Sequence, residues 1–352
     1  MKYIVTAGGT GGHIMPAIAI IQAIREYSSR DKILFIGTDR GMEEKITRQY
    51  GVDFIGLKAM GLHGQSIKNV PKSLLINTTT FFNALKIIRN FSPDWVIGTG
   101  GYITGMVVLA GKILGISCAI HEQNSIPGLT NTILAKMVDK VFLAFPDPKG
   151  LLGAHNTLLT GNPLRKQIIE TDPSKRGDKL IIMGGSQGAR SINKAAVKAV
   201  YLCMQQGLDL SVIHQTGSAD YAWVKKDYQE LGLNVEVYDF IDDMACVYNK
   251  ARLVISRAGG LSLAELSRLG IPAILVPYPY ATQDHQMHNA LFTSRQGGGW
   301  IIPDRQLTAQ RLALEIKTRF QDSEGLKRAS MSMKQLHLGN GSEKIVQEIH
   351  VV

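Results

Sequence analysis

The chain has 352 residues, of which 45% are hydrophobic and 19% are charged, and 39 Lys and Arg against 29 Asp and Glu give a net charge of +10. This composition excludes global disorder, and the length predicts two domains. The three cysteines, Cys118, Cys203 and Cys246, are too far apart for a disulfide framework or a four-cysteine zinc site, which favours a reducing compartment.

The N-terminal apolar run is short and breaks into glycines at Gly8, so we expect no signal peptide. No run reaches the roughly 18 uninterrupted apolar residues that a membrane span requires. We therefore expect a cytoplasmic protein that is either soluble or peripheral to a membrane.

Short apolar runs alternate with helix-like segments along the whole chain. Runs without polar alternation are typical of strands buried on both faces of a parallel sheet with helical crossovers, which predicts an α/β fold. The expected strands lie at 33–36, 95–97, 141–143, 180–182, 253–255 and 273–276.

A weak internal repeat indicates how the chain is divided. Residues 2–6 lead into the glycine loop 8–13 and a helical stretch at 14–24, and half a chain length later residues 179–183 lead into the loop 184–188 and a helical stretch at 192–203. We predict two Rossmann-like domains, at 1–163 and 164–339, with a C-terminal helix at 340–352 that can pack back on the first. A single large sheet with two similar turns is the alternative, which the chain length disfavours.

Three glycine loops, 8–13, 184–188 and 256–260, each fall between an expected strand and an expected helix. There, backbone N–H groups and the helix dipole can face an anion. None is a P-loop, and none is a complete dinucleotide fingerprint, since Ile14 stands where a glycine or alanine is needed. Singly, each could be a structural turn; together they favour a nucleotide-diphosphate ligand.

His13, at the end of the first loop, is placed for proton transfer, because its ordinary pKa is close to neutrality. Its alternative role is a hydrogen bond to a loop carbonyl. The polar run 121–124, His-Glu-Gln-Asn, also follows an expected strand. We expect these four residues to form a site rim or a solvated loop rather than core.

Glu265 falls in the helix after the third loop, where a carboxylate could accept both hydroxyls of a ribose, although spacing alone favours an ordinary exposed helix charge. The polar loop 277–289 suits sugar hydroxyls or plain solvent. His285 and His288 form a weak metal-ligand pair, and the chain has no Asp-x-Asp, so we expect metal-free charge stabilisation and no cofactor.

The stretch between Asp53 and Asp94 contains no acidic residue but has the basic and apolar side chains of an amphipathic segment. Such a segment fits docking onto an anionic membrane surface. The alternatives are a nucleic acid, for which no groove-binding helix or stacking pattern is present, and an ordinary helix with a basic outer face. The residues concerned are Lys58, Lys68, Lys72, Leu74, Leu75, Ile76, Phe81, Phe82, Leu85, Lys86 and Arg89.

Six motifs occur in order that together resemble the MurG family, the bacterial transferases that pass N-acetylglucosamine from its UDP donor to lipid I in cell-wall synthesis. The likeness extends from residue 3 to about residue 290. The motifs are GGTGGH at 8–13, GTGGY at 98–102, HEQN at 121–124, GNP at 161–163, GGSQGA at 184–189 and SRAG at 256–259.

The resemblance implies the glycosyltransferase-B fold, two Rossmann-like domains facing across a cleft that holds the active site. It implies inverting transfer of N-acetylglucosamine to the 4-hydroxyl of undecaprenyl-pyrophosphoryl-N-acetylmuramyl-pentapeptide, giving lipid II and UDP. By resemblance and position His13 is the candidate base, with Glu122 in reserve. Backbone groups around Ser186, together with Arg165, would stabilise the leaving diphosphate.

The resemblance also implies a substrate-binding set, with the donor in the C-terminal domain. Ile241 would contact uracil, Glu265 the ribose and Gln286 the donor sugar. Some relatives have two adjacent glutamines in the sugar-contacting loop, whereas this chain has His285 followed by Gln286, so the resemblance assigns no role to His285. The full set is Thr10, Gly11, Gly12, Tyr102, Asn124, Arg165, Ser186, Gln187, Ile241, Gly260, Leu261, Ser262, Leu263, Ala264, Glu265 and Gln286.

The implied location is the cytoplasmic face of the bacterial inner membrane, as a peripheral protein of peptidoglycan synthesis. The implied partners are UDP-N-acetylglucosamine, lipid I, the anionic membrane surface and other cell-wall synthesis proteins, with no nucleic acid. Rival functions are a glycosyltransferase with another acceptor such as diacylglycerol, a UDP-sugar epimerase, which needs no lipid acceptor, and a non-enzymatic basic binding module, which leaves the glycine loops unexplained.

Overall fold

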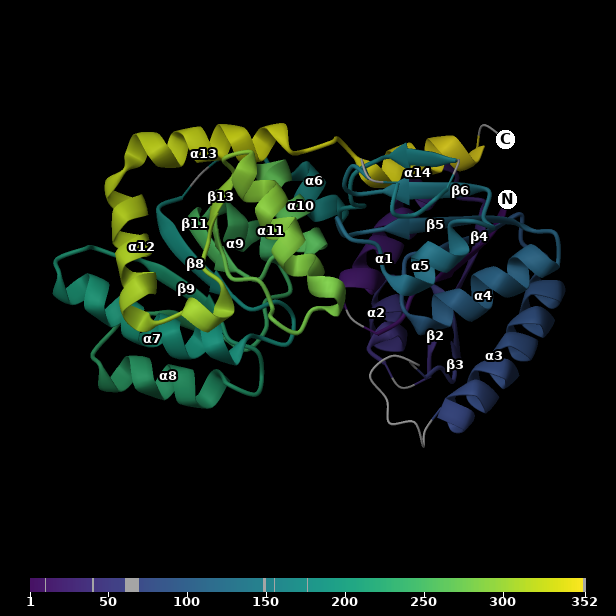
Figure 1. Ribbon diagram of the computed structural model, residues 1–352, viewed down its shortest axis with the longest axis horizontal. Coiled ribbons are helices and arrows are strands. Elements are labelled where there is room, and N and C mark those ends of the chain that lie inside the picture. The colour runs from purple at the N-terminus through teal and green to yellow at the C-terminus, as the bar shows by residue number, and fades with distance from the viewer. Residues whose placement is uncertain are drawn as a thin grey trace. The chain divides into compact units, whose positions relative to one another are not determined.

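The structure is a computed structural model that describes residues 1–9, 11–39, 41–60, 70–147, 150–154, 156–175 and 177–350, the side chains of residues 70–72 excepted. It divides into two compact units (Figure 1). Unit 1 comprises Met1–Lys166 and Leu338–Val352, and unit 2 comprises Gln167–His337. Thr10, one of the predicted binding residues, lies outside the described residues, as does the segment 61–69.

Unit 1 is built on a parallel sheet with the strand order β3-β2-β1-β4-β5-β6-β7 in the described chain. Tyr3 and Val5 of β1 enter one hydrophobic cluster and Ile4 enters another, so the strand is buried on both faces. The strands are β1 (Lys2–Thr6), β2 (Lys32–Thr38), β3 (Asp53–Leu57), β4 (Trp95–Gly98), β5 (Ser117–Glu122), β6 (Lys140–Leu143) and β7 (Thr157–Leu159).

Helices cover both faces of this sheet. The cluster around α1 includes Ile345, Val346 and Ile349 of α14, so the last helix of the chain packs on the first unit. On the other face α3 packs on α4, and the two lie side by side in Figure 1. The helices are α1 (Gly11–Tyr27), α2 (Glu43–Gln49), α3 (Val70–Phe91), α4 (Tyr102–Ile113), α5 (Leu129–Leu134) and α14 (Gly341–His350).

Unit 2 repeats this plan with a parallel sheet in the order β10-β9-β8-β11-β12-β13. Its core lies between the sheet, α7 and α12, and includes Leu180, Ile192 and Ile316. The strands are β8 (Lys179–Met183), β9 (Val212–Gln215), β10 (Glu236–Tyr238), β11 (Ala251–Ser256), β12 (Ala273–Leu275) and β13 (Gly299–Ile301).

The remaining helices precede, connect or follow these strands, and α6 begins at the last residue of unit 1. They are α6 (Lys166–Glu170), α7 (Arg190–Gln205), α8 (Tyr221–Glu230), α9 (Met244–Asn249), α10 (Gly260–Leu269), the 3-10 turn η2 (Thr282–Asp284), α11 (His285–Arg295), the 3-10 turn η3 (Asp304–Gln306), α12 (Ala309–Gln321) and α13 (Ser323–Gln335).

Both sheets reverse their strand order at one point, between β1 and β4 in unit 1 and between β8 and β11 in unit 2. Ligands of open α/β sheets bind outside the carboxyl ends of the strands at such a point. The predicted glycine loops follow β1, β8 and β11, so each unit presents predicted site residues at its own switch point.

The α/β prediction with two Rossmann-like domains is confirmed, and each of the six expected strands is present. Among the helices that the structure describes, none combines the length and apolar character needed to cross a membrane.

Candidate active site

In unit 1, two glycine loops from neighbouring strands pack backbone against backbone. The N–H of Gly8, after β1, donates to the carbonyl of Gly100, after β4, at 3.1 Å. Gly101 has φ +91°, and a Cβ there would lie 2.3 Å from the Gly8 carbonyl oxygen. The GTGGY motif therefore needs its glycines so that the two loops can approach this closely.

His13 lies in the first turn of α1, and the two loops fix both its backbone and its ring. Thr99 Oγ1 donates to the His13 carbonyl at 2.8 Å. The ring Nδ1 lies 3.1 Å from the Thr99 carbonyl oxygen and 3.2 Å from Gln123 Oε1. A Cβ at Gly100 would come within 2.4 Å of Nδ1, so the ring rests against that glycine. The residue as a whole is half-buried.

The polar run at the end of β5 corrects one expectation. His121 is fully buried, and Glu122 and Gln123 are each only 3% exposed, so these three residues are neither a rim nor a solvated loop. Burial is tolerated because their polar atoms are paired with each other and with backbone groups. Only Asn124 is half-buried and reaches the surface.

Glu122 binds a loop through both of its carboxylate oxygens. Oε1 accepts from the backbone N–H of Asn124 at 2.9 Å and from its side-chain amide at 3.3 Å. Oε2 accepts from the Gly128 N–H at 3.0 Å and from Asn131 Nδ2 at 2.8 Å. Four donors hold this buried carboxylate, an arrangement that suits a residue shaping the loop more than one that collects a proton.

The other predicted residues of unit 1 lie around these loops. Gly11 and Gly12 open α1, and Tyr102 opens α4 with an exposed side chain. Arg165 is half-buried and directly precedes α6. Its motif neighbour Asn162 is buried and donates from Nδ2 to the Gln123 carbonyl at 3.2 Å, which connects GNP to HEQN.

In unit 2, the loop after β8 is again shaped by glycines. Gly185 and Gly188 have φ +90° and +76°, and a Cβ at Gly188 would lie 1.9 Å from the Thr216 carbonyl oxygen. Ser186 and Gln187, between them, are exposed. The loop thus presents its two side-chain-bearing residues to solvent at the switch point.

Gln215, at the end of β9, connects this loop to the predicted uracil contact. Its Nε2 donates to the Gly185 carbonyl at 3.1 Å, and its Oε1 accepts from the Ile241 N–H at 3.2 Å. Both amide ends are therefore used, and one side chain sets the spacing of two backbone segments.

The third glycine loop leads into α10, whose N-cap is Gly259, a residue without a capping side chain. Gly260, Leu261, Ser262, Leu263 and Ala264 form its first turns, and Glu265 follows with a side chain that is only 4% exposed. The Tyr248 hydroxyl donates to Glu265 Oε2 at 3.1 Å and also lies 3.7 Å from Met183 Sδ, at the end of β8. Glu265 is thus tied to the strand end that precedes the Ser186 loop, and it is not the exposed helix charge that spacing allowed.

The loop after β12 leads into α11, which carries Gln286, and several hydrogen bonds to the backbone fix this region. Gln286 Oε1 accepts from the Tyr278 N–H at 3.0 Å. His285 Nδ1 bonds to the Thr282 carbonyl at 2.8 Å, and Gln283 and Asp284 adopt left-handed φ values. Buried Asn289 donates to the Ala258 carbonyl at 3.0 Å, which joins α11 to the third glycine loop.

The sequence predicts no role for Arg257 beyond its place in the SRAG motif, yet its guanidinium joins several elements. It donates to the Val276 and Pro277 carbonyls and to Ser191 Oγ, the last at 2.9 Å, and it pairs with Asp304 at 2.5 Å. Gln123, Gln215, Tyr248 and Asn289 were missed as site-shaping residues. Their signal is a polar residue near the end of a buried element, which one sequence alone does not separate from a surface position.

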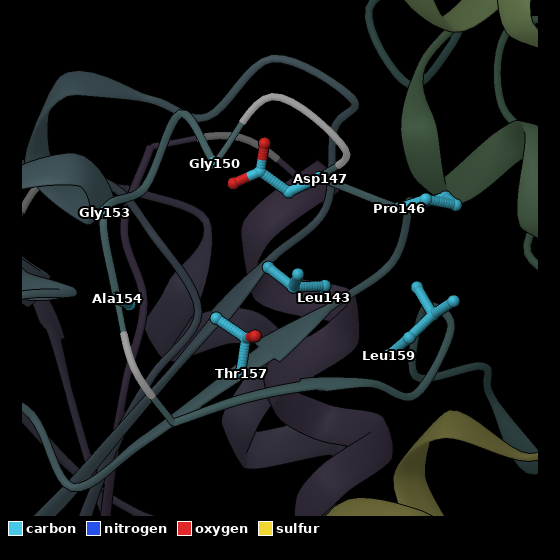
Figure 2. Close-up of a pocket in the computed structure, with 8 residues that line it drawn as sticks. All are labelled: Leu143, Pro146, Asp147, Gly150, Gly153, Ala154, Thr157 and Leu159. Carbon is cyan, nitrogen blue, oxygen red and sulfur yellow. The ribbon is translucent and has the colours of Figure 1, made fainter.

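A pocket of about 340 Å³ lies elsewhere in unit 1, beside β6 and β7 (Figure 2). One residue of its wall, Asp147, accepts hydrogen bonds from the backbone N–H groups of Leu151 and Leu152, so its carboxylate is already engaged. None of the predicted site residues lines it. Within the described ranges, no three His, Cys, Asp or Glu side chains gather as a metal site.

Comparison with known proteins identifies the class. Residues 3–143 match the glycosyltransferase family 28 N-terminal domain, and residues 179–349 match the glycosyltransferase family 28 C-terminal domain. Both halves of the chain therefore match one class of enzyme, the family 28 glycosyltransferases.

Curated relatives narrow this further. Proteins of Desulfotalea psychrophila and Syntrophus aciditrophicus are 39% and 40% identical to the chain, over 98% and 97% of its length and 95% of theirs. Both are named UDP-N-acetylglucosamine–N-acetylmuramyl-(pentapeptide) pyrophosphoryl-undecaprenol N-acetylglucosamine transferase. The chain belongs to this family, the MurG transferases.

Solved structures agree with the fold. The crystal structure of Acinetobacter baumannii MurG matches with a TM-score of 0.79 and 27% identity, covering 100% of this chain and 99% of that one. A UDP-GlcNAc 2-epimerase of Neisseria meningitidis matches with a TM-score of 0.66 at 16% identity and 100% coverage of both chains, a likeness of fold alone.

Proposed function

We propose that the protein transfers N-acetylglucosamine from UDP-N-acetylglucosamine to the 4-hydroxyl of the lipid-linked N-acetylmuramyl-pentapeptide, with inversion. The products are lipid II and UDP. The observation that carries this proposal is the 39–40% identity, over nearly the whole chain, to relatives named for this reaction. The switch-point residues of both units supply the chemistry.

His13 acts as the general base. A single displacement needs a group that takes the proton of the acceptor hydroxyl while O4 attacks C1 of the donor sugar. The half-buried ring of His13 is held through Nδ1 by the Thr99 carbonyl and Gln123, so Nε2 is the nitrogen that can meet the hydroxyl. Glu122, already engaged by four donors, is the weaker candidate.

Unit 2 binds the donor. Glu265 accepts the ribose hydroxyls, Ile241 contacts uracil, and Gln286 contacts the sugar. The support is that Ile241, Glu265 and Gln286 follow β10, β11 and β12. In addition, Tyr248 and Gln215 connect Glu265 and Ile241 to the end of β8 and its glycine loop.

The leaving diphosphate is stabilised by backbone N–H groups around Ser186 and by the guanidinium of Arg165. Positive φ at Gly185 and Gly188 turns the loop so that successive N–H groups can converge on an anion. As the C1–O bond to the phosphate breaks, UDP leaves with the electron pair, and fixed donors lower the cost of that charge.

The acceptor side docks on the anionic inner face of the membrane through α3. Ser73, Asn77, Thr80, Ala84 and Ile88 form its buried stripe. The opposite stripe presents Leu75 and Phe82, 70% and 62% exposed, followed by exposed Lys86 and Arg89. Apolar side chains for the acyl boundary beside cations for the headgroups suit a helix lying in the interface.

The test is to incubate the protein with UDP-N-acetylglucosamine and a lipid I analogue and to determine the product by mass spectrometry and NMR. We expect a lipid-linked disaccharide with a β linkage to O4. Conversion of the donor alone into an epimer, or a disaccharide with retained configuration, would contradict the proposal.

A further inference from the structure

We propose that His121 and Gln123 are positioning residues that fix the proton of neutral His13 on Nδ1 and leave Nε2 as the proton acceptor. The inference rests on the proposed role of His13 as the base and adds what sets its tautomer. It follows from a row of side chains that begins at the Gly161 carbonyl and ends at His13, all within unit 1.

The row begins at His121. Its Nε2 lies 3.1 Å from the Gly161 carbonyl oxygen, and a carbonyl only accepts, so Nε2 carries the hydrogen. Complete burial lowers the pKa of His121 to about 4, so the ring is neutral near pH 7. In a neutral imidazole the other nitrogen is an acceptor, and Nδ1 of His121 therefore offers a lone pair to its neighbour.

Gln123 is next, and His121 determines which way its amide points. Its Nε2 lies 3.2 Å from His121 Nδ1, 3.2 Å from the His121 carbonyl oxygen, and within hydrogen-bond reach of the Thr99 carbonyl oxygen. All three neighbours are acceptors. Turning the amide over would bring Oε1 against three acceptors inside a buried site, so the NH2 group faces them and Oε1 faces His13.

His13 completes the row. Its Nδ1 lies against two oxygens that only accept, Gln123 Oε1 and the Thr99 carbonyl, so Nδ1 carries the hydrogen. In the described part of the chain no hydrogen bond involves Nε2. Its lone pair is available to the acceptor hydroxyl, and the imidazolium that forms keeps Nδ1–H on two oxygens.

The orienting partner is an amide rather than a carboxylate, so it sets the tautomer without adding a charge to the base. Besides His13, the row contains one other titratable group, His121, and Glu122 adjoins it. His121 is neutral, and the oxygens of Glu122 are engaged by Asn124, Gly128 and Asn131. The direction of Nδ1–H is therefore set by hydrogen bonding rather than by a nearby ion pair.

The test is nitrogen NMR of protein labelled with 15N-histidine, with the His13 signals assigned by their loss in His13→Ala. In the wild type near pH 7.5 we expect a protonated Nδ1 and a non-protonated Nε2. A wild-type spectrum with the proton on Nε2 overturns the proposal, and this readout does not depend on any variant folding or on His13 being the base.

Variants then distinguish a role of Gln123 in positioning the His13 proton from a role in supporting the fold alone. Gln123→Leu removes one of the two oxygens that Nδ1 faces and leaves the Thr99 carbonyl, so we expect the share of the Nε2–H tautomer to rise and kcat to fall by up to about tenfold, the order of one lost hydrogen bond.

Thr99→Val is the matched control, since it alters the same turn through Oγ1 but leaves both acceptors of Nδ1 in place. We expect it to keep the wild-type tautomer. An unchanged His13 tautomer in Gln123→Leu, or an equal change in Thr99→Val, would overturn the role of Gln123. Retained turnover in His13→Ala would instead remove the base assignment and leave the tautomer result standing.

Discussion

At the scale of residues, two histidines of unit 1 have the same chemistry and opposite surroundings. His121 is enclosed and kept neutral by burial, whereas His13 is half-buried and held on one ring nitrogen only. Only the second can exchange a proton with a substrate. The same contrast separates Glu122, engaged by four donors, from a carboxylate that could act as a base.

Replacing His13 by alanine should lower kcat by about 100-fold or more, the usual contribution of a general base. Donor affinity, measured by calorimetry with UDP-N-acetylglucosamine, should be kept, because the proposed donor residues are in unit 2. His288→Ala, which removes an exposed histidine without a proposed role, is the control and should keep its turnover. A wild-type kcat in His13→Ala would remove His13 as the base.

Replacing Glu265 by alanine should weaken donor binding about tenfold or more while kcat at saturating donor changes little. The reason is that charged hydrogen bonds to the ribose are lost, whereas the reacting atoms are untouched. Glu265→Gln is the matched variant, since it can still accept from Tyr248 and preserve the fold. The ribose assignment fails if the alanine variant binds UDP as tightly as the wild type.

At the scale of elements, one face of α3 packs into the core of unit 1, whereas the opposite face is exposed and makes no contribution to that core. Asn77 and Thr80 anchor the buried face to the backbone of Met60 and Lys58. Phe81 and Leu85 pack on the core although the sequence groups them with Phe82, because they lie on the flank of the buried stripe. The exposed stripe therefore contains fewer apolar side chains than the apolar content of the segment predicts.

Leu75→Glu together with Phe82→Glu should weaken binding to anionic vesicles at least tenfold. Losing two insertable apolar side chains removes about 1.5–3 kcal/mol each at full burial, and the new charges oppose the surface potential. Sedimentation with phosphatidylglycerol vesicles measures this. Leu314→Glu is the control, since Leu314 is 64% exposed on α12 of unit 2. Equal losses in both proteins would remove α3 as the docking helix.

Much of the fold and part of the site can be predicted from sequence at this scale. Buried runs such as Leu180–Ile182 identify strands, and glycine loops identify where strands end, because both effects are local. The burial of His121 and Gln123 could not be predicted, because it depends on partners such as Gly161 and Thr99 that lie far along the chain. For the same reason the contacts of Gln215 and Tyr248 could not be predicted from the sequence.

At the scale of the whole molecule, each unit encloses a neutral histidine. Burial lowers the pKa of His121 to about 4 and that of His214 to about 3. His214 is bonded to Tyr228 and Asn193 inside unit 2. The unfolded chain, with ordinary histidines, binds more protons below about pH 6.5, so stability falls as the pH falls through that value.

Between pH 6.5 and pH 5 each of these histidines should lower the free energy of unfolding by about 2 kcal/mol. Denaturant unfolding at a series of pH values measures the slope. His214→Asn should have a lower free energy of unfolding than the wild type, but that free energy should depend less steeply on pH. His288→Ala should keep the wild-type pH dependence. Identical slopes in all three proteins would show that His214 is not held neutral. Carboxyl groups with lowered pKa values, such as those of Asp31 and Glu236, act mainly below this window.

The central claim is acceptor-dependent transfer from a UDP-sugar, and UDP release measures it most directly. The assay uses UDP-N-acetylglucosamine in EDTA, with and without a lipid I analogue. We predict rapid UDP release only when the acceptor is present, and no loss of rate on chelation. Release or donor conversion that is independent of the acceptor, or a rate that collapses in EDTA, would contradict the account.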